Sequence, residues 1–242
     1  MNNRSEIKMA KLGNVKLRTL RDVAYESINE AIMKHELMPG ETLTITNLAE
    51  KLGISPTPVR EAVVRLSNEG ILDYEANKRI KVSQIEREDV CEIYEARRLI
   101  EIYMSRKLIS AVKKNEGLKN KLEDLKKTTL LLIETHQDPE QYMRIDLELN
   151  ELFLNVIGNA VLKELFYIVG NKSLRIRTFV EAKNKSENTS GEALKPSARE
   201  HLEIIEALLS GSKDRVIKAM DLHLANSEKR TLKSLEEYFN TL

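Results

Sequence analysis

Two histidines in the C-terminal part of the chain have the spacing and the neighbours to hold a metal ion. His201 and His223 lie on consecutive helical segments joined by a tight turn at residues 210–212, so an antiparallel pair of helices would bring both rings to similar heights. Asp146 and Asn150 are four residues apart on an earlier segment and share one helix face. Two imidazoles, a carboxylate and an amide oxygen could bind a divalent cation inside a bundle. The alternative is that both histidines are core residues with satisfied hydrogen bonds.

Arginine and hydroxyl side chains near residue 60 could read DNA. Thr57 and Arg60 lie in the first turns of a short helix, the part that meets base edges in a helix-turn-helix, and Arg60 can donate two hydrogen bonds to guanine. The alternative is a solvated arginine in a weak exposed ion pair. Ser55 is equally well explained as a helix cap, and the basic residues after residue 77 as a solvated turn. Contacts to phosphate or the minor groove are expected from Ser55, Thr57, Arg65, Lys78, Arg79 and Lys81.

The elements that position this group are predicted between residues 20 and 82. Apolar stripes at helical spacing predict three short helices. Turn signals separate them: Pro39–Gly40 after the first, Gly53 in a left-handed conformation after the second, and Pro56 at the first position of the third. Two apolar-rich runs around a basic turn predict a two-stranded wing. The predicted helices are 20–37, 45–52 and 56–68, and the predicted strands are 71–74 and 80–83.

Longer helical patterns begin at residue 87 and would position the metal candidates. Leucine rows such as Leu118, Leu122 and Leu125 indicate a bundle core. A polar loop is predicted at 183–191, and Ser197–Glu200 has the sequence of a capping box that opens the next helix. The predicted helices are 87–110, 116–134, 138–157, 159–184, 197–210 and 212–240. We therefore predict a mainly α fold with an N-terminal winged helix-turn-helix, residues 1–82, and a C-terminal all-α antiparallel helical bundle, residues 83–242.

The composition limits the function classes. With 39 basic and 38 acidic residues among 242, the net charge is +1, which excludes a polycation that holds nucleic acid by bulk charge and an acidic solvating protein. Residues 1–21 hold six basic residues against one acidic residue, and form either an arm that touches a polyanion or a frayed terminus. A single cysteine, Cys91, no visible secretory signal and no run of 18 apolar residues lead us to expect a cytoplasmic protein without membrane contact.

The N-terminal motifs resemble those of the GntR family of bacterial transcription regulators. This resemblance implies a winged helix-turn-helix that binds double-stranded operator DNA. Two positions depart from the family pattern, because Pro56 replaces a basic residue that reaches the DNA and Arg79 replaces a common wing glycine, so the operator sequence is not transferred. The matching segments are Pro39–Leu43, Leu48–Ser55, Thr57–Ala62 and Glu69–Gly70.

The C-terminal part resembles the FCD ligand-binding domain of the FadR-type subfamily, in its shorter six-helix variant. The motifs that carry the resemblance are Tyr94–Glu101 and Glu200–Leu224. Metal-binding members carry an Asp-x3-His motif and two later histidines. The resemblance therefore implies a zinc, nickel or manganese site. Asn150 stands in place of the first histidine, and its amide oxygen is a harder and weaker ligand than imidazole, which favours manganese. The implied ligands are Asp146, Asn150, His201 and His223.

The same resemblance implies a small organic acid as the effector. Its carboxylate could occupy open positions on the metal and pair with an arginine. Arg97 stands in the family's Glu-x-Arg motif and is the first candidate, although an exposed i,i+4 pair with Glu101 would also explain it. Arg175 and Arg177 are the second candidates.

These expectations describe a ligand-responsive transcriptional regulator, a repressor that binds a palindromic operator as a homodimer. The alternative is a metal-dependent enzyme built on the helical domain, which needs an acid or base beside the metal. Glu148 and Glu151 are the nearest carboxylates in sequence to Asp146, and neither shares its helix face, which argues against catalysis. A structural adaptor with a vestigial DNA head is a third option, favoured by Pro56 and the missing wing glycine.

Overall fold

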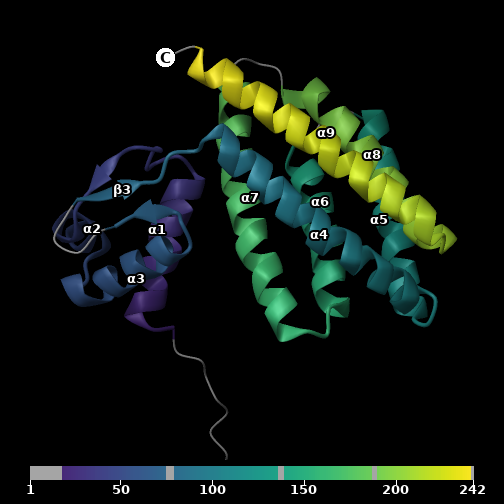
Figure 1. Cartoon of the computed structure of the whole chain (residues 1–242), viewed down its shortest axis with the longest axis horizontal. Helices are drawn as coiled ribbons and strands as arrows, with labels where there is room; N and C mark the ends of the chain where they lie inside the picture. The colour runs from purple at the N-terminus through teal and green to yellow at the C-terminus, as the bar shows by residue number, and fades with distance from the viewer. Residues whose placement is uncertain (1–17, 75–78, 136–138, 187–189, 241–242) are drawn as a thin grey trace, which may run out of the picture.

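The computed structural model describes residues 18–74, 79–135, 139–186 and 190–240, and its helices and strands build two hydrophobic cores. The first core unites buried side chains from Ala24 to Val82, and the second unites those from Ile85 to Leu235. Figure 1 shows the corresponding parts side by side, with the small N-terminal part at one end of the long helices. We call the first part the head and the second the bundle.

The head contains a winged helix-turn-helix. Its helices are α1 (Leu20–Met33), α2 (Ile45–Leu52) and α3 (Pro56–Asn68). Gly53 closes α2 with a left-handed φ of 65°, which glycine adopts without steric cost, and Pro56 occupies the first position of α3, where no N–H partner is needed. Both local predictions are confirmed.

The wing differs from the two-stranded prediction, because a third strand joins it. The sheet has the order β1-β3-β2 and both pairings are antiparallel, with Leu43 opposite Ile80 and Leu72 opposite Val82. A two-residue strand shows no alternation of apolar and polar residues, so the sequence pattern carries no signal for β1. The strands are β1 (Thr42–Leu43), β2 (Leu72–Asp73) and β3 (Ile80–Val82).

The first helix is also shorter than predicted. It ends at Met33 rather than at residue 37, because His35 adopts a left-handed φ of 60° and turns the chain. The backbone N–H groups of Glu36 and Leu37 then both donate to the carbonyl of Ala31. Leu37 is buried by this turn, so the apolar residue that suggested a longer helix belongs to the core without being helical.

Over the described residues from 87 onward, six helices form the bundle, as predicted. They are α4 (Arg87–Val112), α5 (Glu116–Thr135), α6 (Pro139–Val156), α7 (Ala160–Ser186), α8 (Ser190–Ser210) and α9 (Lys213–Phe239). The prediction that a capping box at Ser197 opens a helix is wrong, because α8 already begins at Ser190 and continues through Pro196. A proline inside a helix removes one backbone hydrogen bond, and strong helix formers such as Ala193 and Leu194 precede it.

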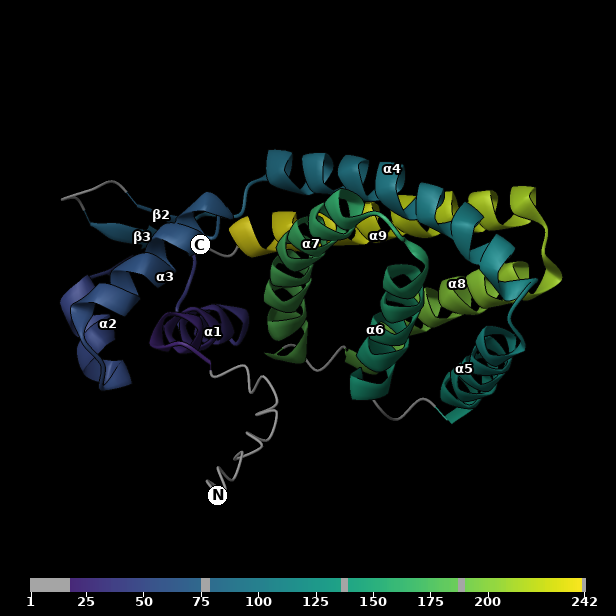
Figure 2. The same cartoon turned by 90° about the horizontal axis from the view of Figure 1, so that it is seen from below.

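The long helices α4 and α9 run antiparallel along one side of the bundle, and α7 is the bundle helix that lies beside α1 of the head (Figures 1 and 2). Contacts from Arg87 to Glu236 and from Tyr94 to Thr231 fix the register of α4 against α9. Within the described ranges, no helix has both the length and the apolar character needed to cross a bilayer.

Candidate functional site

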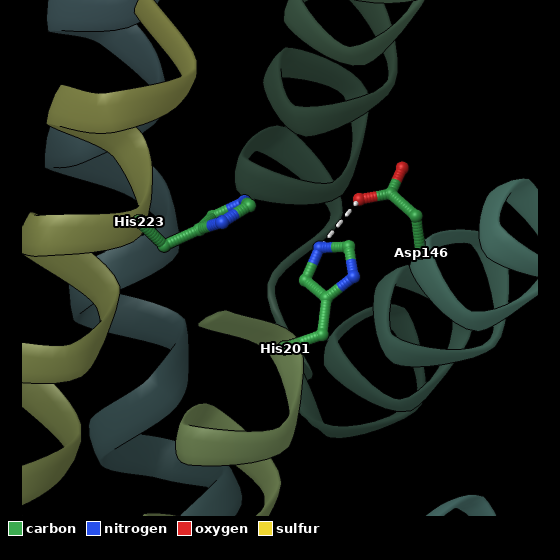
Figure 3. A group of neighbouring side chains, drawn as sticks. All are labelled: Asp146, His201 and His223. Carbon is green, nitrogen blue, oxygen red and sulfur yellow. Dashed lines mark ion pairs between the residues drawn. The ribbon is translucent and has the colours of Figure 1, made fainter. Parts of the chain in front are cut away.

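Asp146, His201 and His223 meet in the interior of the bundle. They come from α6, α8 and α9, all three are buried, and one ligand atom from each lies within 4.8 Å of the other two (Figure 3). The Nε2 atom of His201 is 3.5 Å from Oδ1 of Asp146, and the two imidazole centroids are 4.7 Å apart. The family resemblance implied these three residues as ligands, and the packing of α6, α8 and α9 brings them together.

The carboxylate of Asp146 is held ionised. Burial opposes its ionisation, but the guanidinium of Arg177 and the neighbouring His201 outweigh that effect and keep the pKa of Asp146 well below its usual range. Arg177 donates from Nη1 to Oδ2 at 2.7 Å, whereas Oδ1 faces His201. The oxygen on the histidine side is therefore the one available for a cation, and the contact with Arg177 need not break.

His223 is presented as a neutral imidazole. Its Nδ1 lies 2.9 Å from Oε2 of Glu200, and burial lowers its pKa to about 4 despite that carboxylate. Burial also opposes ionisation of Glu200, yet hydrogen bonds from Arg230 and His223 lower the pKa of Glu200 to about 2. At neutral pH Glu200 can only accept a proton, so Nδ1 of His223 donates and Nε2 keeps its lone pair.

These side chains fit a divalent cation. At metal–ligand distances of about 2.0–2.2 Å, neighbouring ligand atoms lie about 3–3.5 Å apart, so the 3.5 Å separation of Asp146 from His201 already suits a shared ion. All three ligand atoms lie within 4.8 Å of one another, so closing on one ion requires only a small inward movement. Two imidazole nitrogens and one carboxylate oxygen are ligands that zinc, nickel and manganese accept.

A pocket opens beside this cluster. It has a volume of about 130 Å³. Asp146 of the cluster lines it, together with Asn150 and Arg177. Asn150 lies one turn beyond Asp146 on α6, so its amide faces the same space. Arg97 lines the pocket from α4 and Arg177 lines it from α7, so two of the three predicted effector arginines meet here.

Arg97 is buried in the pocket wall, where two of its guanidinium nitrogens are hydrogen-bonded to neighbouring side chains. Its Nε donates to Oε1 of Glu101 at 2.6 Å and its Nη1 donates to the hydroxyl of Ser173 at 3.1 Å. Burial disfavours the charged guanidinium, but Glu101 and Tyr94 raise the pKa of Arg97 above its ordinary value. The i,i+4 pair with Glu101 is therefore real, but it is buried inside the pocket instead of exposed on the surface.

Arg175 does not line the pocket, which corrects its place among the effector candidates. Consecutive helical residues are about 100° apart, so Arg175 points about 160–200° away from Ser173 and Arg177 on the same helix. Its Nη2 donates to the backbone carbonyl of Ser83, at the link between head and bundle. Burial lowers the pKa of Arg175 from its ordinary value.

The same outer face of α7 meets the head again one turn later. Phe179 packs edge-on against His35 of the head, with ring centroids 5.6 Å apart, and against Tyr238 of α9 at 4.7 Å. α7 therefore contacts the pocket with one face, through Ser173 and Arg177, and the head with the other.

On the head, the predicted DNA-facing residues are exposed. Arg60 and Arg79 line one surface groove, although Arg60 comes from α3 and Arg79 directly precedes β3. Thr57 is three residues before Arg60 on the same helix and is also exposed, as is Lys81 in β3. Ser55 precedes α3 but makes no capping hydrogen bond with its side chain. Lys78 lies outside the described residues, as does most of the basic arm.

Arg65 is engaged within the head. Its guanidinium stacks over the ring of Tyr25, with 3.7 Å between Cζ and the ring centroid, and its Nε donates to Glu69 at 3.2 Å. Asp22 lies 4.0 Å from its Nη1. These partners hold the side chain against α1, and the phosphate contact expected of Arg65 stays a prediction.

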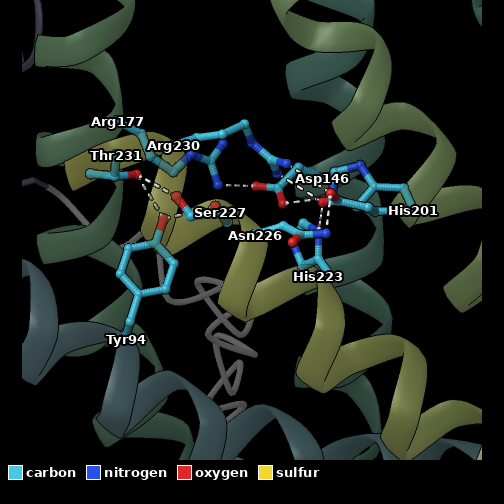
Figure 4. A network of polar contacts seen from close by, with 10 residues as sticks. Tyr94, Asp146, Arg177, His201, His223, Asn226, Ser227, Arg230 and Thr231 are labelled. Atoms are coloured by element: carbon cyan, nitrogen blue, oxygen red, sulfur yellow. Dashed lines mark hydrogen bonds and ion pairs between the residues drawn. The ribbon is translucent and has the colours of Figure 1, made fainter. Parts of the chain in front are cut away.

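Sequence reasoning missed the polar network behind His223. Glu200 binds His223, Asn226 and Arg230 at once. The hydroxyl of Tyr94 also reaches α9, at Ser227 (Figure 4). The available signal was the spacing of His223, Asn226 and Arg230, which are i, i+3 and i+7 and share one face of α9. A carboxylate opposite that face was needed to complete the pattern.

Two protein families match the chain. The FCD domain matches residues 92–226, more than half of the chain, and includes every candidate metal ligand. The bacterial regulatory proteins of the gntR family match residues 20–82, which contain the complete winged helix-turn-helix.

Individual relatives and solved structures also match this chain. The HTH-type transcriptional regulator YdhC of Bacillus subtilis is 24% identical over 215 residues, covering 88% of this chain and 91% of the relative. The structure of E. coli McbR/YncC superposes with a TM-score of 0.70 at 18% identity, covering 92% of this chain and all of that one. The metal-free FCD domain of TM0439 superposes with a TM-score of 0.52 at 24% identity, covering 64% of this chain and all of that one.

Proposed function

Because this chain belongs to the GntR family of bacterial regulatory proteins and carries an FCD domain, we propose that it is a repressor controlled by a small organic acid bound beside a divalent metal ion. As a member of this family it is a DNA-binding transcriptional regulator, and the alternative of a metal-dependent enzyme is not retained, since family and relatives are regulators.

The observation that carries the proposal is the buried cluster of Asp146, His201 and His223 next to a pocket with two arginines. A metal ion bound there would offer its open positions to a ligand carboxylate as a Lewis acid. The residues of the chain would do the rest: Asp146 and the two imidazoles hold the ion, and Arg97 and Arg177 bind and orient the acid.

The charges around the pocket favour an acid with two carboxylates. The charged side chains that line it are Arg97, Arg177, Glu101 and Asp146, which cancel one another. A divalent ion with neutral imidazoles would add two positive charges to a buried site, and an uncompensated buried charge is costly. A doubly negative ligand restores neutrality, and a pocket of about 130 Å³ limits that ligand to a small molecule.

α7 provides a route from this pocket to the DNA-binding head. Its inner face carries Arg177, bonded to Asp146, and its outer face carries Arg175 and Phe179, which contact Ser83 and His35. A ligand that draws Arg177 toward the pocket would rotate or shift this helix against both head contacts. The ligand can bias the head only by its different affinity for the two positions, and couplings of this kind are typically about 1–3 kcal/mol.

A homodimer is supported by apolar side chains exposed on the outer side of α4 and α9. Leu99 is 73% exposed, Tyr103 44% and Leu222 54%, and contacts between Arg98 and Glu228 hold the two helices together. We propose that this face joins two copies, since a two-fold dimer places two heads on the related half-sites of a palindromic operator.

A metabolite sensor that acts on DNA also fits a cytoplasmic location.

Titration of a labelled promoter fragment from the protein's own locus tests the proposal. We expect specific, salt-sensitive binding that weakens when metal and small dicarboxylic acids are added together. Operator binding that does not respond to any combination of metal and acid would contradict the sensing role. Absence of specific binding under all conditions would contradict an operator at the protein's own locus.

A further inference from the structure

Glu200 sits at the centre of a cluster of donors behind the candidate metal site. Its Oε2 accepts from Nδ1 of His223 at 2.9 Å and from Nη2 of Arg230 at 2.8 Å. Its Oε1 accepts from Nη1 of Arg230 at 2.7 Å and from Nδ2 of Asn226 at 2.9 Å. The arginine thus grips both oxygens in the bidentate geometry that gives the strongest and most directional carboxylate contacts.

The three donors are arranged by one face of α9. His223, Asn226 and Arg230 are spaced i, i+3 and i+7, which stacks them along the helix axis opposite a single carboxylate from α8 (Figure 4). Glu200 immediately precedes His201 in sequence, so the residue that holds one candidate ligand is covalently next to the other. Arg230 lies beyond residue 226, where the match to the FCD domain ends.

This arrangement decides which nitrogen of His223 can bind a metal. A carboxylate has no proton to give, so the nitrogen facing it must carry the hydrogen. Nδ1 is therefore the donor, and the lone pair stays on Nε2, on the side of the ring that faces away from Glu200. With the opposite tautomer the ring would present N–H to the space it shares with Asp146 and His201, and no ion could bind there.

We propose that Glu200, held in place by Arg230 and Asn226, is a positioning residue that fixes the tautomer and the ring orientation of His223 for metal binding. The inference rests on the metal site of the proposed function. Carboxylates that orient metal-bound histidines in this way typically change metal affinity about 10–100-fold when they are removed.

A neighbouring ion pair supplies a matched control. Glu203 is one turn further along α8 and also pairs with an arginine of α9, with its two oxygens 2.8 and 3.0 Å from Nε and Nη2 of Arg215. Both pairs tie α8 to α9, but the pair of Glu203 is surface-exposed and makes no contact with His223. If metal affinity depends only on an ion pair between α8 and α9, substituting Glu200 or Glu203 should weaken it. If it depends on the partner of His223, only substituting Glu200 should weaken it.

The experiment compares full-length wild-type protein with the variants Glu200→Gln and Glu203→Gln by calorimetric titration with Zn²⁺ and, separately, Mn²⁺. We expect Glu200→Gln to bind the preferred metal about 10–100-fold more weakly and Glu203→Gln to bind within about twofold of wild type. Equal affinities for wild type and Glu200→Gln would overturn the proposal. If Glu200→Gln does not fold by circular dichroism, Arg230→Met replaces it, with a smaller loss of affinity expected because Glu200 itself remains.

A second measurement, on metal-free protein, reads the tautomer directly. The chain has four histidines, so ¹⁵N labelling of histidine gives a sparse spectrum that can be assigned with single His→Gln variants. We expect the Nδ1–H form at His223 in wild type and a mixture of forms in Glu200→Gln. An Nε2–H form in wild type would overturn the proposal. If wild type binds neither metal but shows the Nδ1–H form, the metal function fails while the hold of Glu200 on His223 stands.

Discussion

Replacing Arg60 by alanine should separate DNA recognition from head stability, with Arg65→Ala as its matched control. Both arginines lie on α3 and both are exposed enough for solvent contact. Arg60 faces the groove that it shares with Arg79, whereas Arg65 lies over Tyr25 and pairs with Glu69. The two substitutions remove the same side chain from one helix but break different interactions.

The magnitudes follow from these partners. An arginine that contacts guanine through two hydrogen bonds contributes about 1–3 kcal/mol of discrimination, so Arg60→Ala should weaken operator binding about 5- to 150-fold. For Arg65, the stacking contributes about 0.5–1 kcal/mol, and the ion pair with Glu69 contributes about 0.3–0.5 kcal/mol. Arg65→Ala should therefore destabilise the protein by about 1 kcal/mol, which lowers the melting temperature of a chain of this size by about 2–4 °C.

Fluorescence anisotropy with operator and random duplexes measures the first effect, and thermal unfolding followed by circular dichroism measures the second. Arg60→Ala should lose operator affinity while keeping wild-type stability, and Arg65→Ala should bind the operator almost normally below its melting temperature. The reasoning is refuted if Arg65→Ala loses as much operator affinity as Arg60→Ala in folded protein, because Arg65 would then contact DNA.

Three further predictions follow from the bundle. Asp146→Asn should abolish the metal-dependent stabilisation of the protein, which for wild type should reach about 2.7 kcal/mol at 100 times the dissociation constant; thermal shift with Mn²⁺ and Zn²⁺ checks this, and equal shifts in both proteins would contradict it. Arg175→Met removes the bond to the Ser83 carbonyl, so ligand binding should persist while its effect on operator affinity falls, and an unchanged effect in anisotropy would exclude this route. The pKa of Glu200 is lowered to about 2, so the ionised carboxylate stabilises the fold fully above about pH 4.5, and this stabilisation is lost as the pH falls toward 2. In urea unfolding, the difference in unfolding free energy between wild type and Glu200→Gln should shrink over that range. A difference that stays constant would argue against an ionised Glu200.

Much of the fold is predictable because its signals are local. The caps at Gly53 and Pro56 depend on the conformational limits of those residues, and the bundle helices on apolar rows repeated over several turns. The third strand of the wing was not predictable, since Leu43 joins the sheet by pairing with Ile80, far along the chain. The early start of α8 was missed because Pro196 reads as a boundary but is accommodated within the helix.

In the candidate site, too, some residues were predictable from the sequence and others were not. Asp146, His201 and His223 were named from helix periodicity and family resemblance, and α6, α8 and α9 bring them together. Helix geometry alone could have removed one arginine, because Arg175 and Arg177 are two residues apart and cannot both face the pocket. The partners of Glu200 were not predictable, since they lie 23 to 30 residues away and depend on the register of α8 against α9.

The metal site itself is most directly tested by anomalous diffraction from crystals of the protein grown with Mn²⁺ or Zn²⁺. We expect one strong peak about 2.0–2.2 Å from Oδ1 of Asp146 and from the Nε2 atoms of His201 and His223, with Arg177 still bonded to the other carboxylate oxygen. A peak elsewhere in the bundle, or an unchanged contact between Asp146 and His201 with no peak at saturating metal, would contradict it.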